Sequence, residues 1–173
     1  MNPAAKYVIA ALLIAVATHF AIVHAMPRVL MDAAFARVSD KGAHVNTWRH
    51  SPRITEASRT IVLPSPDLHY AVCPYDLSHG PVRIHVDTWP AYWSLSLYAA
   101  NSDNFFVLDD REAHDGAEIT LIRAGHAPPD HAGRIVESPS QRGIALVRRL
   151  APSAAEFDAA TEASRGDVCA PAP

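Results

Sequence analysis

The sequence predicts a mainly β protein, an antiparallel sandwich or open barrel, with an N-terminal transmembrane helix, a juxtamembrane helix and a C-terminal helix. Three observations predict this fold class. Residues 7–26 form an uncharged apolar run, short runs rich in Val, Ile, Tyr, Trp and Phe follow from residue 60, and a helical pattern returns after residue 152.

The apolar run is long enough to cross a membrane. Residues 7–26 carry no formal charge, and about 20 residues at 1.5 Å rise match the hydrocarbon thickness. Residues 1–6 are expected to be a short cytoplasmic N-terminus, where Lys6 favours export of the rest of the chain. The segment that ends at Ala25 also resembles a signal-peptide cleavage site. The length of the run favours an uncleaved anchor over a removed signal peptide, and both readings export the remainder.

The chain is therefore expected in the cytoplasmic (inner) membrane of a bacterium, single-pass, with its C-terminal part in the periplasm. Residues 27–58 are expected to form a juxtamembrane helix and a linker. Pro27 opens a second helical stretch that ends near Gly42, and the polar residues 43–58 contain Pro52.

Residues 59–173 are expected to form a β-rich exported domain with a C-terminal helix. Val82, Ile84 and Val86 alternate with polar residues, as do Trp93, Leu95 and Leu97. Such alternation is typical of strands with one buried face. Strands are expected to begin near Thr60 and to occupy residues 68–77, 82–86, 92–98, 105–108, 117–123, 133–137 and 143–149.

The last segment changes from strand to helix spacing. Ser153 and Glu156 form a capping box, in which each side chain bonds the other residue's backbone N–H. Good helix formers follow, and Gly166 is a plausible stop. Phe157 and Ala160 are expected to dock this helix on the sheet.

The chain has two cysteines, Cys73 and Cys169. An even count in an exported chain favours a disulfide, which would tie the C-terminal tail to a strand. The alternative is two buried thiols, or one buried and one free.

Composition argues against several classes of function. The formal net charge is −3 and both signs are scattered, so no basic stripe is present for nucleic acid. The ten histidines lack the spacing of a metal site, with neither an H-x-H nor an H-E-x-x-H motif. Neither a metal nor a cofactor is therefore expected.

The best candidate site is the polar loop from Asn101 to Arg111. Asn101, Asp103, Asn104 and Arg111 combine amides, a carboxylate and a guanidinium that could orient a polar ligand. Arg142 is added as a ligand-binding candidate, with Asp103 or Glu137 as its possible ion-pair partner. Asn and Asp are equally typical of turns that have no chemical role.

Five segments of the chain look familiar, and the most specific of them is Tyr92–Val107. The others are Ser65–Leu68, Cys73–Leu77, Gly80–Arg83 and Glu137–Gly143. Together they resemble one bacterial family, the domain of unknown function 1254. The resemblance covers about residues 60–150 and implies a β-rich domain, often with an N-terminal membrane helix, that has no established activity. Longer relatives continue into a second domain of unknown function, numbered 1214.

Two functions follow as hypotheses. The first is a membrane-anchored, non-catalytic module that associates with a partner protein carrying the companion domain 1214, as the resemblance implies. The second is an enzyme or small polar-ligand binder that uses the loop from Asn101 to Arg111. The first is preferred because no catalytic spacing, such as a G-x-S-x-G elbow, is present.

Overall fold

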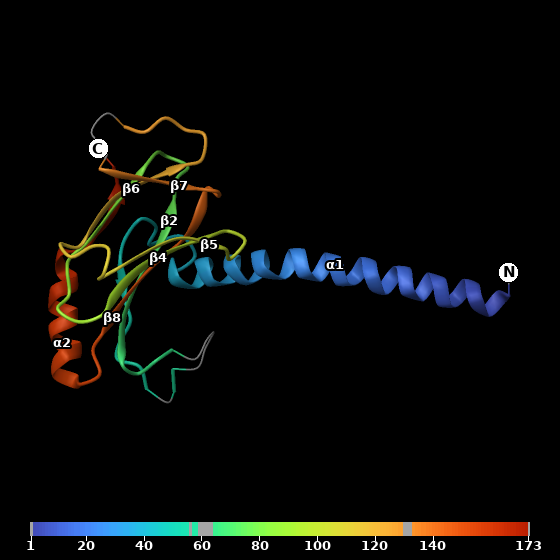
Figure 1. The fold of residues 1–173 in the computed structure, drawn as a ribbon, viewed down its shortest axis with the longest axis horizontal. Helices are drawn as coiled ribbons and strands as arrows, with labels where there is room; N and C mark the ends of the chain where they lie inside the picture. Colours follow the sequence, from blue (N-terminus) through green and yellow to red (C-terminus); the bar gives the residue numbers. More distant parts are fainter. Residues whose placement is uncertain (1, 56, 59–63, 130–132, 173) are drawn as a thin grey trace.

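The computed structural model describes residues 2–55, 57–58, 64–129 and 133–172. Two β-sheets pack on each other, α1 projects from one side as a long rod, and α2 lies on the opposite side (Figure 1). The elements are α1 (Pro3–Val38), β1 (Arg49–His50), β2 (Leu68–Asp76), β3 (Val82–Val86), β4 (Trp93–Ala99), β5 (Asn104–Asp109), β6 (Ala117–Arg123), β7 (Arg134–Ser138), β8 (Arg142–Leu150), α2 (Ala154–Ala163) and β9 (Val168–Pro171).

The first sheet has the order β1-β2-β8-β4-β5, and all its neighbours are antiparallel. The second has the order β7-β6-β3-β9, in which β6 and β7 run parallel. This parallel pair is a local exception within the antiparallel arrangement that was expected. A tight hairpin joins only antiparallel strands, whereas a longer crossover lets the chain return in the same direction. The parallel pairing of β6 and β7 requires such a crossover.

The core is formed by the alternating apolar residues that the sequence predicted to be buried. Val82, Ile84 and Val86 of β3 are fully buried, and Trp93 and Leu95 of β4 face them from the other sheet within one hydrophobic cluster. Every second residue of a strand points to the same face, so each sheet contributes one apolar face to this shared core. The mainly β fold class is confirmed. The expected start of a strand at Thr60 lies outside the described residues.

The two helical stretches expected on either side of Pro27 form one continuous helix of 36 residues. Proline lacks an N–H and its ring crowds the carbonyls of the preceding turn, which is why a break was expected. In α1 the Arg28 guanidinium donates a hydrogen bond to the His24 carbonyl at 2.7 Å. Pro27 leaves the Val23 carbonyl, four residues earlier, without its usual backbone donor, and α1 nevertheless continues to Val38.

The helix α2 begins with the expected capping box. The Ser153 hydroxyl accepts from the Glu156 amide at 3.2 Å, and the Glu156 carboxylate accepts from the Ser153 amide at 2.9 Å. Ala160 is buried, and the Phe157 ring lies 5.0 Å from that of His69. The helix ends at Ala163 and a 3₁₀ turn continues to residue 166.

The tail after α2 forms a strand that the sequence did not reveal. β9 pairs with β3, with Cys169 opposite Ile84, and a disulfide joins Cys169 to Cys73 of β2. Because β2 and β9 belong to different sheets, the bond crosses the core and fixes the edge strand of the second sheet to an interior strand of the first.

Candidate functional site

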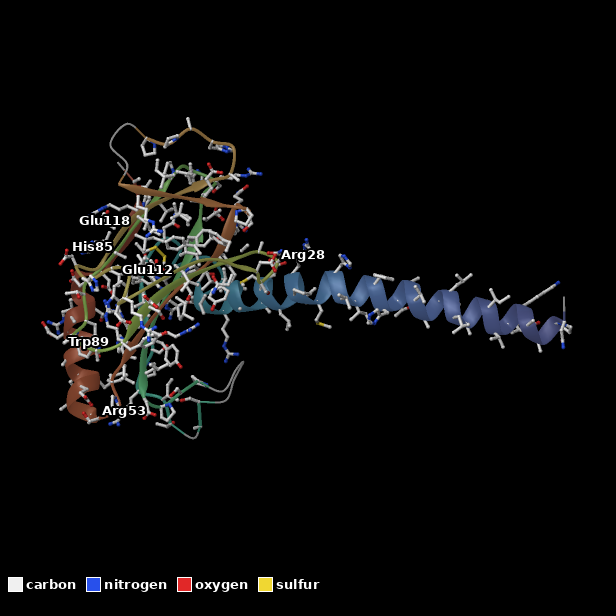
Figure 2. The ribbon with its side chains drawn as sticks, in the orientation of Figure 1. Arg28, Arg53, His85, Trp89, Glu112 and Glu118 are labelled. Atoms are coloured by element: carbon white, nitrogen blue, oxygen red, sulfur yellow. A yellow bond between two sulfur atoms is a disulfide. The ribbon has the colours of Figure 1, made fainter. Side chains whose placement is uncertain are left out.

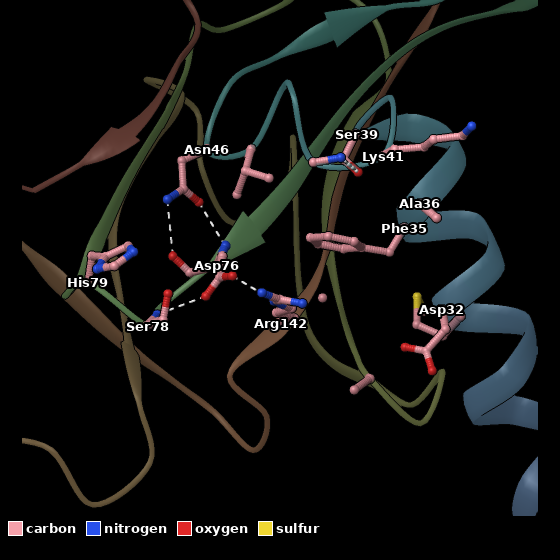
Figure 3. Close-up of a pocket in the computed structure, with 15 residues that line it drawn as sticks. Asp32, Phe35, Ala36, Ser39, Lys41, Asn46, Asp76, Ser78, His79 and Arg142 are labelled. Carbon is pink, nitrogen blue, oxygen red and sulfur yellow. Dashed lines mark hydrogen bonds and ion pairs between the residues drawn. The ribbon is translucent and has the colours of Figure 1, made fainter.

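A pocket of about 720 Å³ lies where the end of α1 meets the ends of β2 and β8 (Figure 3). Its volume is within the range of roughly 300–1,000 Å³ that is typical of small-molecule sites. Met31, Asp32 and Phe35 line it from the helix, and Asp76 and Arg142 line it from the sheet. The pocket therefore combines apolar side chains with both signs of charge.

Asn46 holds the end of β2 at this pocket. Its amide side chain donates to the Asp76 carbonyl at 3.0 Å and accepts from the Asp76 amide at 2.8 Å. Its own backbone N–H donates to the Pro74 carbonyl at 2.9 Å. Asn46 has a φ of +53°, a conformation that asparagine tolerates better than most residues. Asn46 thus bonds the backbone at the end of β2 much as a neighbouring strand would, and these bonds hold Asp76 in the pocket wall.

The Asp76 carboxylate is largely buried and fully engaged. It accepts from the Ser78 amide at 2.8 Å and from the Arg142 Nε at 2.6 Å. Burial alone would raise the pKa of Asp76, but the hydrogen bonds from Ser78 and the charge and hydrogen bond of Arg142 together lower it. Asp76 is therefore a fixed anion rather than a proton donor.

Arg142 is held by Asp76 and not by Asp103 or Glu137, which were its expected partners. Its guanidinium carbon lies 5.8 Å from the centre of the Phe35 ring, and its side chain is 61% exposed. Within the described part of the chain, neither terminal nitrogen of Arg142 has a hydrogen-bond partner. The residue thus presents free donors at the mouth of the pocket.

The polar turn after β4 lies at the same end of the sandwich as Arg142. Asn101 and Asp103 hydrogen-bond each other in the turn, and Asn104 is exposed at the start of β5. The Ser102 hydroxyl donates to the Pro27 carbonyl of α1 at 2.8 Å. This turn therefore touches α1, although its polar side chains do not line the pocket.

Arg111 lies at the other end of the sandwich. It follows β5, whose six residues separate it from the turn by about 17 Å. Its amide donates to the Asp109 carboxylate at 3.0 Å within a local turn. The structure therefore brings Arg142 near the Asn101–Asn104 turn but leaves Arg111 apart from both.

Sequence reasoning missed Asp32, Phe35, Asn46 and Asp76. No local motif marks them, because they meet only when α1 docks and when β2 and β8 pair in a register that sets Asp76 opposite Arg142. An acidic residue at the end of a predicted strand was the one available signal.

A second polar group is buried at the opposite end of the same strands. The Arg149 guanidinium makes a bidentate pair with Asp167, with distances of 2.8 and 2.7 Å, and both side chains are 0% exposed. Arg149 also donates to the Asp87 carbonyl at 3.0 Å, and the Asp87 amide donates to Asp167 at 2.9 Å. These bonds tie β8 to the residue that follows β3 and the residue that precedes β9, which makes this group structural.

His69 is buried beside Arg149, and neither of its ring nitrogens has a partner among the described residues. Burial, followed by the nearby charges of His50 and Arg149, lowers the pKa of His69 to about 4 from the ordinary 6.5. As pH falls, the His69 ring is therefore protonated near pH 6.5 in the unfolded chain but only near pH 4 in the folded chain. The stability conferred by neutral His69 is complete above pH 6.5 and is lost as pH falls toward 4.

We therefore expect the free energy of unfolding to fall by about 2–3 kcal/mol more in the native chain than in a His69→Leu variant between pH 7.5 and 4.5. Urea titration at both pH values measures the free energy of unfolding of each chain. The His69→Leu variant accounts for the contribution of the other titrating groups. The same pH dependence in both chains would contradict the expectation.

Charged residues also gather on the side of the domain away from α1, where Figure 2 shows His85 and Glu118. Arg83 donates to Glu118 at 2.7 Å, and the two ring nitrogens of His85 lie 2.9 Å from Glu118 and 3.0 Å from Asp87. The bond from Arg83 is the main cause of a lowered pKa of Glu118. Among the residues that the structure describes, no group of three or more His, Cys, Asp or Glu could hold a metal ion.

Known families and structures resemble this fold. A family model described as "Protein of unknown function (DUF1254)" matches residues 45–171, which begin just after α1 and include both sheets. The match is wider than the segments on which the resemblance was first based. No curated protein matches the sequence.

Two crystal structures are similar. The VPA0106 protein from Vibrio parahaemolyticus has a TM-score of 0.66 at 14% identity, over 86% of this chain and 36% of that one. An uncharacterised protein from Burkholderia cenocepacia has a TM-score of 0.47 at 19% identity, over 69% of this chain and 35% of that one. At such identity the first likeness shows the fold alone. The chain spans about a third of the length of these proteins.

Proposed function

This chain belongs to the DUF1254 family of proteins of unknown function, and we propose that it is a membrane-anchored, exported module that associates with a partner protein. The observation that carries the proposal is the surface of α1. An 18-residue window of this helix has a mean hydropathy of 2.2, and none of it is buried inside the molecule. Side chains such as Leu13, Ile14 and Phe20 are 59–66% exposed. Lipid is the solvent that suits such a surface.

The length of α1 supports the same role. Its 36 residues span about 54 Å, of which the hydrocarbon core of a bilayer takes about 30 Å. The remaining turns carry Arg28, Asp32 and Arg37 and dock on the sandwich through Met31 and Phe35. One rigid helix would therefore hold the domain at a set distance from the membrane.

The partner is the finer part of the proposal. In VPA0106 the matched part is 36% of the chain, so most of that protein lies outside the fold described above. We propose that a protein carrying the companion domain 1214 docks on the side where β5 and β7 form the edges of their sheets. Val107 of β5 is 52% exposed and Ile135 of β7 is 42% exposed, and Arg134 stacks over Phe106 between them. Edge strands with exposed apolar residues are common sites of association.

Membrane anchoring is tested by extraction at alkaline pH. The full chain is expected to stay in carbonate-washed membranes at its complete mass of 18.7 kDa. A Leu13→Arg/Val16→Arg variant places two guanidinium groups at the centre of the apolar run, at a penalty of about 5–7 kcal/mol, and is expected to be released. The matched control is Val29→Arg/Leu30→Arg, which changes equally exposed residues of the same helix beyond the run. Release of the native chain, or a product cut after Ala25, would overturn the anchor.

The same washed membranes, solubilised in mild detergent, test the partner. Purification of the full chain is expected to recover a protein with the companion domain, and Val107→Lys is expected to reduce its recovery. Leu150→Lys is the control, because Leu150 is exposed but lies at the end of β8 rather than on an edge strand. If the anchored chain recovers no such protein, the proposal of a partner is contradicted and the proposal of a membrane anchor is unaffected.

A further inference from the structure

We propose that the pocket between α1 and the sheet binds the headgroup of a zwitterionic phospholipid, such as phosphatidylethanolamine, from the membrane that holds α1. This inference rests on the proposed anchoring and names a ligand for the pocket. Three observations carry it: the depth of the pocket along α1, the balance of charge in its lining, and the free polar groups at its mouth.

The depth follows from the helix. The Ser102 hydroxyl bonds the Pro27 carbonyl, and Pro27 directly follows the last residue of the apolar run. The turn after β4 therefore reaches the membrane boundary. Asp32, on the membrane side of the pocket, lies about 9 Å beyond Met26 along the helix axis. The headgroup layer is roughly 5–8 Å thick on each side of the hydrocarbon, so Asp32 lies at about its outer edge, where the ammonium end of a headgroup is found.

The charge in the lining is balanced. Asp32 and Asp76 are acidic, and Lys41 and Arg142 are basic. A purely anionic ligand would face two carboxylates and a purely cationic ligand would face two cations. A ligand with an ammonium group and a phosphate on one short linker matches both signs, since Coulomb attraction then acts at each end.

The polar groups at the mouth are free to bind. Asp32 and Lys41 make no ion pair with any described residue, and Arg142 uses only its Nε for Asp76. A guanidinium with free terminal nitrogens suits a phosphate, and the Asp32 carboxylate suits an ammonium group. Met31 and Phe35 also line the pocket and offer apolar contact to the ethylene group that links the ammonium to the phosphate. Figure 3 shows Asp32 and Phe35 on the helix facing Arg142 on the sheet.

Native mass spectrometry of the full chain tests the proposal. The chain is released from neutral detergent micelles that contain equal amounts of phosphatidylethanolamine and phosphatidylglycerol. Adducts with phosphatidylethanolamine are expected to exceed the others about two- to fivefold, as expected for one or two exposed charge contacts. Asp32→Asn is expected to remove this preference, and Arg142→Ala to lower both adducts.

The matched control is Arg134→Ala. Arg134 also stacks over an aromatic ring, with its guanidinium carbon 5.1 Å from the centre of Phe106, but it is not in the pocket, and its loss is expected to leave the adducts unchanged. Equal adducts of the two lipids on the native chain, or no effect of Asp32→Asn, would overturn the proposal. Stronger binding of glycerophosphoethanolamine than of the intact lipid at equal concentration would overturn the assignment to a lipid rather than a free headgroup.

These outcomes are separate from those for anchoring. All of the variants keep the apolar run, so all are expected to remain in carbonate-washed membranes. A chain that is anchored but shows no headgroup preference would contradict this inference alone.

Discussion

Loss of the disulfide between Cys73 and Cys169 is expected to lower the free energy of unfolding by about 4–5 kcal/mol. The two cysteines are 96 residues apart in the sequence, and closing a loop of this size removes about that much entropy from the unfolded chain. A domain has about 5–15 kcal/mol in total, so this one bond is a large part of its stability. The edge strand β9, which has four residues, is expected to detach first.

Urea titration with and without reductant measures this effect. The native chain is expected to lose stability in reductant, whereas a Cys73→Ala/Cys169→Ala variant is expected to be equally weak in both conditions. An unchanged midpoint for the native chain in reductant, with both thiols shown to be free, would contradict the expectation.

Asp167→Ala is expected to destabilise the chain by about 3–5 kcal/mol, because it leaves the Arg149 charge buried without a counter-ion. Arg149 and Asp167 are both 0% exposed, so water does not replace the lost carboxylate. Glu162→Ala is the matched control. It breaks the pair with Arg165 in the neighbouring turn, where both side chains are more than 60% exposed, and exposed pairs contribute about 0–1 kcal/mol.

Thermal unfolding of both variants measures the difference. If Asp167→Ala and Glu162→Ala had equal effects, the Arg149–Asp167 pair would not be a structural element of the core. An Arg149→Met/Asp167→Ala variant is expected to recover part of the loss, since it removes the unpaired charge.

The elements that could be predicted are those with a local cause. Alternating apolar residues identified β3 with its bounds Val82–Val86, and the Ser153–Glu156 spacing identified the start of α2. The uncharged run 7–26 identified the apolar part of α1 by the same kind of reasoning. Each depends on residues within a few positions of one another.

What could not be predicted depends on contacts that are distant in sequence. The register that sets Asp76 opposite Arg142 needs the pairing of β2 with β8, and no rule of local sequence gives that pairing. β9 is only four residues long and ends in Pro171, so it resembles a tail until β3 is in place. The continuation of α1 through Pro27 goes against the local tendency of proline to end or kink a helix.

The candidate site likewise contains one residue that the sequence predicted and others that it could not predict. Arg142, which was added to the candidate site as a ligand-binding residue, does line the pocket. Arg111 was grouped with Asn101 by nearness in the sequence, but the strand between them holds the two ends of this loop about 17 Å apart. A site assembled from α1, β2 and β8 becomes visible only in three dimensions.

The central claim is that α1 spans a membrane and that the sandwich lies on its far side, and the state of the two cysteines in living cells tests it most directly. Cells are lysed in denaturant with a maleimide-polyethylene glycol reagent and without reductant, and the chain is followed by its electrophoretic mobility. The account predicts no adduct, because an exported domain keeps Cys73 and Cys169 bonded, and two adducts after prior reduction. A Cys73→Ala variant, with one adduct from Cys169, is the control for labelling. Two adducts on the native chain without reductant would show a reduced, cytosolic domain and would contradict the account.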